Sequence, residues 1–273
     1  MWIRWHLYCW VTFFVLTPAF GEPIGIDTKG LDEVEIQALS KLLSQGACPC
    51  DKDKSILACV TDQSCPSAIE LAVYGAEKFR EGLSALDVQQ AVVKKYIQDH
   101  VHYTFDLKNA PVKGATEAKI TVVEFADFQC GHCARLSESI DVLKAEFGDQ
   151  VRFVFKQFPM TRHPFAHYAA RASLAAHNQG AFWQFHDLLF KHQFQLSEAK
   201  IDGFASELKL DMKKYTVDRE HPEIYAQIAR DRKEAIAAGL RATPTLYING
   251  RLYTESKSLD SLRKTLKNAL TAQ

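Results

Sequence analysis

The chain has 273 residues, with 33 Lys+Arg balanced by 33 Asp+Glu and with 47% hydrophobic residues. This is the composition of a globular protein, and zero formal charge argues against a surface built to bind nucleic-acid phosphates or an anionic membrane. After residue 25 the chain has no apolar run of the length needed to span a bilayer.

The first 21 residues predict a secretory signal peptide. Arg4 precedes an almost wholly apolar stretch, Leu7–Phe20, and small residues around Ala19 and Gly21 supply a cleavage-like site. The apolar stretch is shorter than a bilayer span, although an uncleaved amphipathic anchor is an alternative reading. We therefore expect residues 1–21 to be removed on export to the periplasm or cell envelope.

A small cysteine-rich helical module is predicted over residues 27–102. Apolar residues recur at helical spacing in three segments, which end before Gly46, before Gly82 and near His100. The loop between the first two segments holds four cysteines: Cys48, Cys50, Cys59 and Cys65. An even number of cysteines in an exported chain points to disulfides, and two structural bridges of open pairing are the preferred interpretation. A second redox pair and a thiolate metal site are the alternatives.

A second domain is predicted over residues 110–273, and it opens with a βαβ unit. The β-rich run Ile120–Phe125 leads into a helix that ends at Gly148, and Val151–Phe155 reads as the next strand. This order predicts a parallel strand pair with a helix packed against it.

The rest of this domain reads as helices followed by a hairpin. Four helical segments fill about residues 160–240. Asn249-Gly250 then joins two short β-rich runs, and this pair favours a two-residue turn of type I′. A last helix is expected over about residues 259–270. The domain is therefore expected to be an α/β unit that contains a helical insertion.

Cys130-Gly131-His132-Cys133 lies where the first strand of this domain meets its helix. A helix N-terminus presents free N–H groups and positive partial charge to the first sulfur, and this setting, with His132 between the cysteines, lowers the pKa of a thiol. We assign Cys130 as the attacking thiol and Cys133 as the resolving thiol. A structural disulfide or half of a zinc site is the alternative, but zinc needs two more ligands and no second CxxC follows.

Glu124 interrupts the apolar strand six residues before Cys130. A buried carboxylate is costly unless it is paired or functional, and burial raises its pKa. Such a group could accept and return the proton of Cys133, with Lys156 on the neighbouring strand as a candidate partner. In the alternative reading, strand alternation turns Glu124 to solvent.

Thr243-Pro244 stands directly before the first strand of the hairpin. Proline has no backbone N–H to donate, so at the start of a strand it breaks no hydrogen bond of the sheet. The local sequence alone favours an ordinary trans peptide bond there.

Three motifs, in this order, resemble the DsbA-like thioredoxin-fold thiol–disulfide oxidoreductases of the bacterial cell envelope. They are the run from Glu124 to Cys133, the run from Phe155 to Pro159 with His163-Pro164, and the run from Ala242 to Thr245 with Asn249-Gly250. The resemblance covers about residues 110–273. It implies a thioredoxin fold with an inserted helical domain, preceded here by the cysteine-rich module.

The resemblance also implies roles for single residues. Cys130 would be the nucleophile, Cys133 the resolving thiol and Glu124 a buried acid. Thr243-Pro244 would form a cis-proline loop that faces the disulfide.

The activity implied is disulfide exchange with exported polypeptides through the Cys130–Cys133 pair. No dissociable cofactor or metal is expected, because the pair itself carries two electrons. Gly-His between the cysteines is similar to the dipeptide of protein disulfide isomerases, whereas DsbA has Pro-His, so the oxidase or isomerase direction stays open. A membrane redox partner that resets the disulfide fits this scheme. The alternative from another class is a metal-handling envelope protein that uses the cysteines as thiolate ligands.

Overall fold

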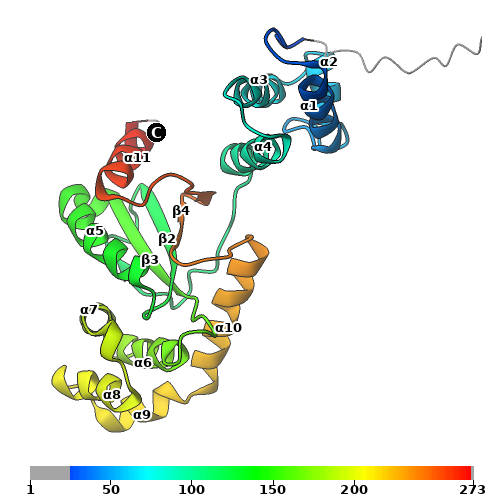
Figure 1. Ribbon diagram of the computed structural model, residues 1–273. Helices are drawn as coiled ribbons and strands as arrows, with labels where there is room; N and C mark the ends of the chain where they lie inside the picture. Colours follow the sequence, from blue (N-terminus) through cyan, green and yellow to red (C-terminus); the bar gives the residue numbers. More distant parts are fainter. Residues whose placement is uncertain (1–24, 272–273) are drawn as a thin grey trace, which may run out of the picture. The chain divides into compact units, whose positions relative to one another are not determined.

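The computed structural model describes residues 25–271, which divide into two compact units between Tyr96 and Ile97 (Figure 1). The signal peptide expected over residues 1–21 lies outside the described residues. Within residues 25–271, no helix combines the length and the apolar character that a membrane crossing requires.

The first unit is built from α1 (Glu33–Gln45), α2 (Ile56–Thr61), α3 (Pro66–Arg80) and most of α4 (Ala85–His100). Helix α1 begins at a capping box, in which the Asp32 and Glu35 side chains each accept from the other residue's backbone N–H. Apolar residues of the helices form one core that includes Leu39, Leu43, Leu71, Ala76, Val88 and Val92. Helix α2 was not predicted, because six residues are too few for a periodic pattern.

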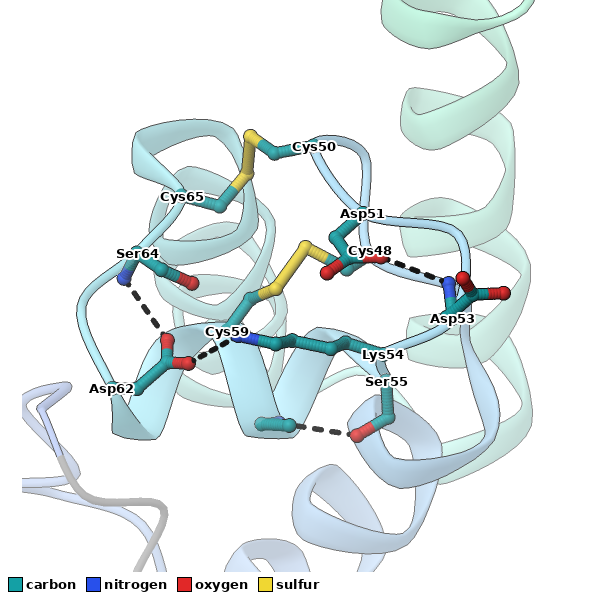
Figure 2. The surroundings of a disulfide bond; sticks show 11 residues. Cys48, Cys50, Asp51, Asp53, Lys54, Ser55, Cys59, Asp62, Ser64 and Cys65 are labelled. Atoms are coloured by element: carbon teal, nitrogen blue, oxygen red, sulfur yellow. Dashed lines mark hydrogen bonds and ion pairs between the residues drawn. A yellow bond between two sulfur atoms is a disulfide. The ribbon is translucent and has the colours of Figure 1, made fainter.

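Two disulfides hold the loop between α1 and α3. Cys48 pairs with Cys59 in α2, and Cys50 pairs with Cys65, which occupies the N-cap position of α3 (Figure 2). The pairing that the sequence left open is therefore between alternate cysteines. Cys48, Cys59 and Cys65 are fully buried in the core of the unit, whereas Cys50 is exposed.

The second unit contains a five-stranded mixed sheet in the order β1-β3-β2-β4-β5. The strands are β1 (Val112–Lys113), β2 (Ile120–Ala126), β3 (Val151–Gln157), β4 (Thr245–Ile248) and β5 (Arg251–Leu252). Strands β2 and β3 are parallel, as the βαβ pattern predicts, and β4 pairs antiparallel with the other edge of β2. The two-residue strand β1 pairs antiparallel with β3 and was not predicted.

Helices cover both faces of this sheet (Figure 1). On one face, α5 (Gly131–Phe147) and α11 (Leu259–Thr271) pack on the alternate residues Ile120 and Val122 of β2. On the other face, α10 (Pro222–Ala237) packs on Val123 and Phe125. The strict alternation along β2 therefore assigns each of its side chains to one helical layer.

The stretch between β3 and β4 is helical throughout. It contains α6 (Ala166–His177), α7 (Phe182–Lys191), α8 (Glu198–Glu207), α9 (Met212–Arg219) and α10. Small alanines on α6 allow close packing against α7, whose Phe182 and Phe185 are buried in the same core. Helix α9 was not predicted, because Tyr215 is its one buried residue and the Asp211 side chain caps it. The thioredoxin fold with a helical insertion and a preceding cysteine-rich module is confirmed.

Candidate active site

The CxxC motif lies at the start of α5, directly after the loop that follows β2. Cys130 is the N-cap residue of this helix, and no side chain caps the helix there. Cys133 lies in its first turn, and both cysteines are free thiols. Cys130 is 6% exposed and Cys133 is fully buried. The first sulfur is thus the one closer to solvent, and the second lies behind it.

The environment of Cys130 favours its thiolate. Its pKa is lowered from 9.0 to about 5, chiefly because the Cys133 thiol donates a hydrogen bond to its sulfur. Thr243 and the backbone N–H groups of His132 and Cys133 lower it further, while burial opposes them. These donors favour negative charge on the Cys130 sulfur. The sulfur is also at the N-terminus of a 17-residue helix, where the positive end of the helix dipole favours the thiolate as well.

Cys133 and Glu124 are held in their protonated forms. Burial raises the pKa of Cys133 well above its ordinary value, and the hydrogen bond to Cys130 and the charge of Glu124 add to this. Burial also raises the pKa of Glu124 from 4.5 to about 8, with a smaller contribution from the charge of Cys130. Glu124 is 4% exposed, and its Oε1 has no hydrogen-bond partner within residues 25–271. A buried acid is therefore coupled electrostatically to both sulfurs.

Lys156 is not the partner of Glu124, contrary to expectation. In the sheet register Glu124 lies opposite Phe155, whereas Lys156 lies opposite Phe125, so the two side chains are on opposite faces. The Lys156 ammonium instead bonds the carboxylates of Asp231 and Glu234 on α10. The solvent-facing alternative for Glu124 is also wrong, because the strand is covered on both faces.

The Thr243–Pro244 loop lies against the CxxC motif, although it is more than a hundred residues away in the sequence. Its peptide bond is cis. The Cys130 sulfur lies 3.4 Å from the Thr243 carbonyl oxygen, to which Cys130 donates a hydrogen bond when it is a neutral thiol. The fold therefore brings the first and the third sequence motif of the resemblance to one place.

The His132 side chain bonds its neighbour on the helix and makes no hydrogen bond to either sulfur among those found within residues 25–271. Arg135 donates a hydrogen bond from Nη2 to His132 Nδ1 at 2.6 Å, and both residues are exposed. His132 acts on Cys130 through its backbone N–H instead. Both side chains line an open groove of about 680 Å³ beside the cysteines, together with Glu138, Ala242, Thr243, Pro244 and Lys257 among others.

Asp127 is a buried acid next to this site that the sequence reasoning did not single out. Its carboxylate is fully buried and accepts from the backbone N–H groups of Gln129 and Met160 and from His163 Nδ1. It thereby fastens the loop before Cys130 to the segment that follows β3. An acid between the apolar residues Ala126 and Phe128 is the same signal that singled out Glu124, and it could have identified Asp127.

Known proteins match the second unit. The family model described as thioredoxin matches residues 106–268. A thioredoxin-like oxidoreductase from Silicibacter pomeroyi DSS-3 is 31% identical, with a TM-score of 0.54 over 60% of this chain and 94% of that one. The thiol–disulfide exchange protein alpha-DsbA2 from Wolbachia pipientis is 23% identical, with a TM-score of 0.57 over 68% of this chain and 98% of that one. Oxidised BdbD from Bacillus subtilis is 24% identical, with a TM-score of 0.56 over 62% of this chain and 97% of that one.

Among curated proteins, the Na(+)/H(+) antiporter NhaA of Herminiimonas arsenicoxydans is 41% identical over 140 residues, which are 51% of this chain and 22% of that protein. The chain spans about a quarter of the length of the curated relatives it matches. The likeness therefore concerns only a part of those proteins. Since the family model covers more than half of this chain, the chain belongs to the thioredoxin family.

Proposed function

We propose that the chain is an exported thiol–disulfide oxidoreductase that donates the Cys130–Cys133 disulfide to polypeptide dithiols. The observation that carries this proposal is the asymmetry of the two sulfurs. Cys130 is at the helix N-cap with a pKa of about 5, whereas Cys133 is fully buried and keeps its proton. One sulfur is thus suited to meet a substrate, and the other is shielded from it.

The exchange begins with the oxidised pair. A substrate thiolate attacks the Cys130 sulfur and forms a mixed disulfide, and Cys133 leaves with the electron pair of the broken S–S bond. A second substrate thiolate then attacks the substrate sulfur of the mixed disulfide. Cys130 leaves as a thiolate, which is a good leaving group because its pKa is low. The substrate gains one disulfide, and the chain gains two electrons.

Glu124 supplies the proton that Cys133 needs when it leaves. With a pKa of about 8, the Glu124 carboxyl is mostly protonated at neutral pH. Its unpartnered Oε1 is buried in the layer between β2 and α5, where water cannot readily protonate the sulfur. The same carboxylate recovers the proton when the disulfide is formed again. Glu124 is thus proposed as a general acid and base in both directions.

The low pKa of Cys130 supports the oxidase direction. A thiolate with a pKa of about 5 stabilises the reduced protein at pH 7 by roughly 3 kcal/mol, relative to a thiol of ordinary pKa. For a two-electron couple this makes the disulfide more oxidising by about 60 mV.

The substrate is proposed to be an extended polypeptide segment with cysteines. The open groove beside Cys130 is lined by polar and charged side chains and by the Thr243-Pro244 loop, which suits a chain held mainly through its backbone. Export by the expected signal peptide would place the reaction in the periplasm or cell envelope. A membrane redox partner would then reoxidise Cys130 and Cys133.

A direct test is stoichiometric transfer of a disulfide. The oxidised chain is mixed with an equal amount of a reduced peptide that contains two cysteines, and the products are alkylated in acid and weighed by mass spectrometry. The peptide should gain one disulfide as Cys130 and Cys133 become thiols, and Cys130→Ala should abolish the transfer. A peptide that stays reduced beside an intact Cys130–Cys133 disulfide would contradict the proposal.

A further inference from the structure

We propose that the first unit contains a second exchange-active site, a two-disulfide relay that opens at Cys50 and passes inward through Cys48. The relay uses none of the groups of the Cys130 site, so a test of the relay does not depend on whether the proposed function is correct.

The two disulfides lie within reach of one another. The sulfurs of Cys48, Cys50 and Cys65 are all within 4.8 Å of each other, although Cys48 is bonded to Cys59 and the other two are bonded together. The Cys59 sulfur is not part of this group. Figure 2 shows the Cys50–Cys65 bond and the Cys48–Cys59 bond near one another. A new disulfide would bring the Cys48 sulfur from within 4.8 Å of either neighbour to the bonding distance of about 2.05 Å.

Exposure gives this cluster a single entrance. Cys50 is exposed on the loop before Asp51, whereas Cys48, Cys59 and Cys65 are fully buried. An external thiolate can therefore attack the sulfur of Cys50 and not the other three. Disulfide exchange depends on which sulfur is accessible, so the accessible one determines which bond opens first.

The bond at this entrance has a suitable leaving group. Cys65 is the N-cap of the 15-residue helix α3, and no side-chain hydrogen bond caps that helix. Cys130 has the same position on α5. The positive end of the helix dipole stabilises a Cys65 thiolate, whereas Cys50 is in a loop and lies at no helix N-terminus. Attack at Cys50 with departure of Cys65 is thus the favoured polarity.

The inward step follows from the cluster. The external thiolate forms a mixed disulfide with Cys50, and Cys65 leaves with the electron pair. The Cys65 thiolate attacks the Cys48 sulfur, a Cys48–Cys65 bond forms, and Cys59 leaves and takes up a proton. A second thiol of the same partner then releases Cys50 as a thiol. The partner, a dithiol, is oxidised to a disulfide, and the unit is left with one disulfide and two thiols.

Two single substitutions in the full chain test the inward step. Both are made with Cys130→Ser and Cys133→Ser, which silence the other site. Cys59→Ala frees Cys48 beside the outer disulfide, whereas Cys48→Ala frees Cys59, which is outside the sulfur group. After acid quenching and alkylation, disulfide mapping should find Cys48 linked to Cys50 or Cys65 in the first variant. The matched control should keep the Cys50–Cys65 link alone.

The same map in both variants would overturn the relay, whether it shows one intact Cys50–Cys65 link or scrambled links. A second measurement needs no change in the first unit and tests the entrance. The chain with Cys130→Ser and Cys133→Ser is incubated with reduced glutathione, and mixed disulfides are trapped and located. The relay predicts that glutathione is first found on Cys50. First labelling of Cys65, Cys48 or Cys59, or no labelling of the folded chain, would overturn it.

Discussion

At Cys130 the reactivity of the site depends on a hydrogen bond from the neighbouring thiol. The Cys133 thiol is the largest contribution to the lowered pKa of Cys130, and it can donate because burial keeps it protonated. The pair thus divides one function between two identical side chains. Their different burial, rather than their chemistry, makes one an attacking group and the other a resolving group.

Cys133→Ala should therefore raise the pKa of Cys130, because the main donor to its sulfur is removed. The expected rise is more than about one pH unit. The measurement is the rate of alkylation of Cys130 against pH. His132→Leu is the matched control, since the His132 imidazole bonds Arg135 and its backbone N–H survives the substitution. A larger rise in the control than in Cys133→Ala would contradict this account of the thiolate.

Glu124 should make the stability of the reduced protein depend on pH. Its pKa is about 8 in the folded chain and near 4.5 when unfolded, so the folded state keeps a proton that the unfolded state loses. Stability should fall between pH 4.5 and pH 8 and should be unaffected by this group outside that window. At pH 7 the loss amounts to about 3 kcal/mol.

Glu124→Gln should remove this loss, because the amide does not ionise. Urea unfolding of both reduced proteins at several pH values measures the difference. The free energy of unfolding of the variant, relative to the native chain, should rise by about 3 kcal/mol from pH 4.5 to pH 7. A difference that is constant over this range would show that Glu124 is ionised in the folded chain.

At the scale of elements, a buried ion cluster joins α10 to β3. Lys156 and Asp231 are nearly inaccessible to solvent, and Lys156 Nζ lies 3.0 Å from Asp231 Oδ1. The Lys156 ammonium also pairs with the Glu234 carboxylate and donates a hydrogen bond to the backbone carbonyl of Asp106. Burial raises the pKa of Asp231 to about 6, although the charge of Lys156 works against this. The lysine thus keeps this carboxylate ionised at neutral pH.

Lys156→Met should lower the free energy of unfolding by about 3 to 5 kcal/mol, because it leaves a buried carboxylate without its cation. Adding Asp231→Asn should restore part of the loss, since no unpaired charge then remains. Urea unfolding measures both, and the alkylation rate of Cys130 should stay unchanged. If the free energy of unfolding of Lys156→Met alone were within about 1 kcal/mol of that of the native chain, the ion cluster would not be what holds α10 on β3.

The elements that the sequence predicted are those with long or repeated signals. Strands β2 and β3 are seven-residue segments rich in apolar residues, and Asn249 and Gly250 both have the positive φ of a type I′ turn. The elements it missed, α2, α9 and β1, have six, eight and two residues. Caps and tertiary partners determine these short elements, and neither leaves a periodic pattern in the chain.

At the scale of the whole molecule, the candidate residues could be found in the sequence but their relations could not. The CxxC motif, Glu124 and the proline loop each have a local signature. The assignment of Lys156 to Glu124 failed because neighbouring strands place them on opposite faces of the sheet, which depends on register rather than on composition. The disulfide pairing and the hydrogen bond from Cys130 to Thr243 likewise depend on three-dimensional placement.

The central claim is that Cys130 and Cys133 form an oxidising couple, and the equilibrium of this pair with glutathione tests it most directly. The chain is equilibrated in buffers of graded reduced and oxidised glutathione, quenched in acid, and assayed for the Cys130–Cys133 disulfide by mass spectrometry. A stabilised Cys130 thiolate predicts a reduction potential of about −120 to −180 mV, in the range of disulfide donors. A potential near about −270 mV, which is that of a reductase, would contradict the account.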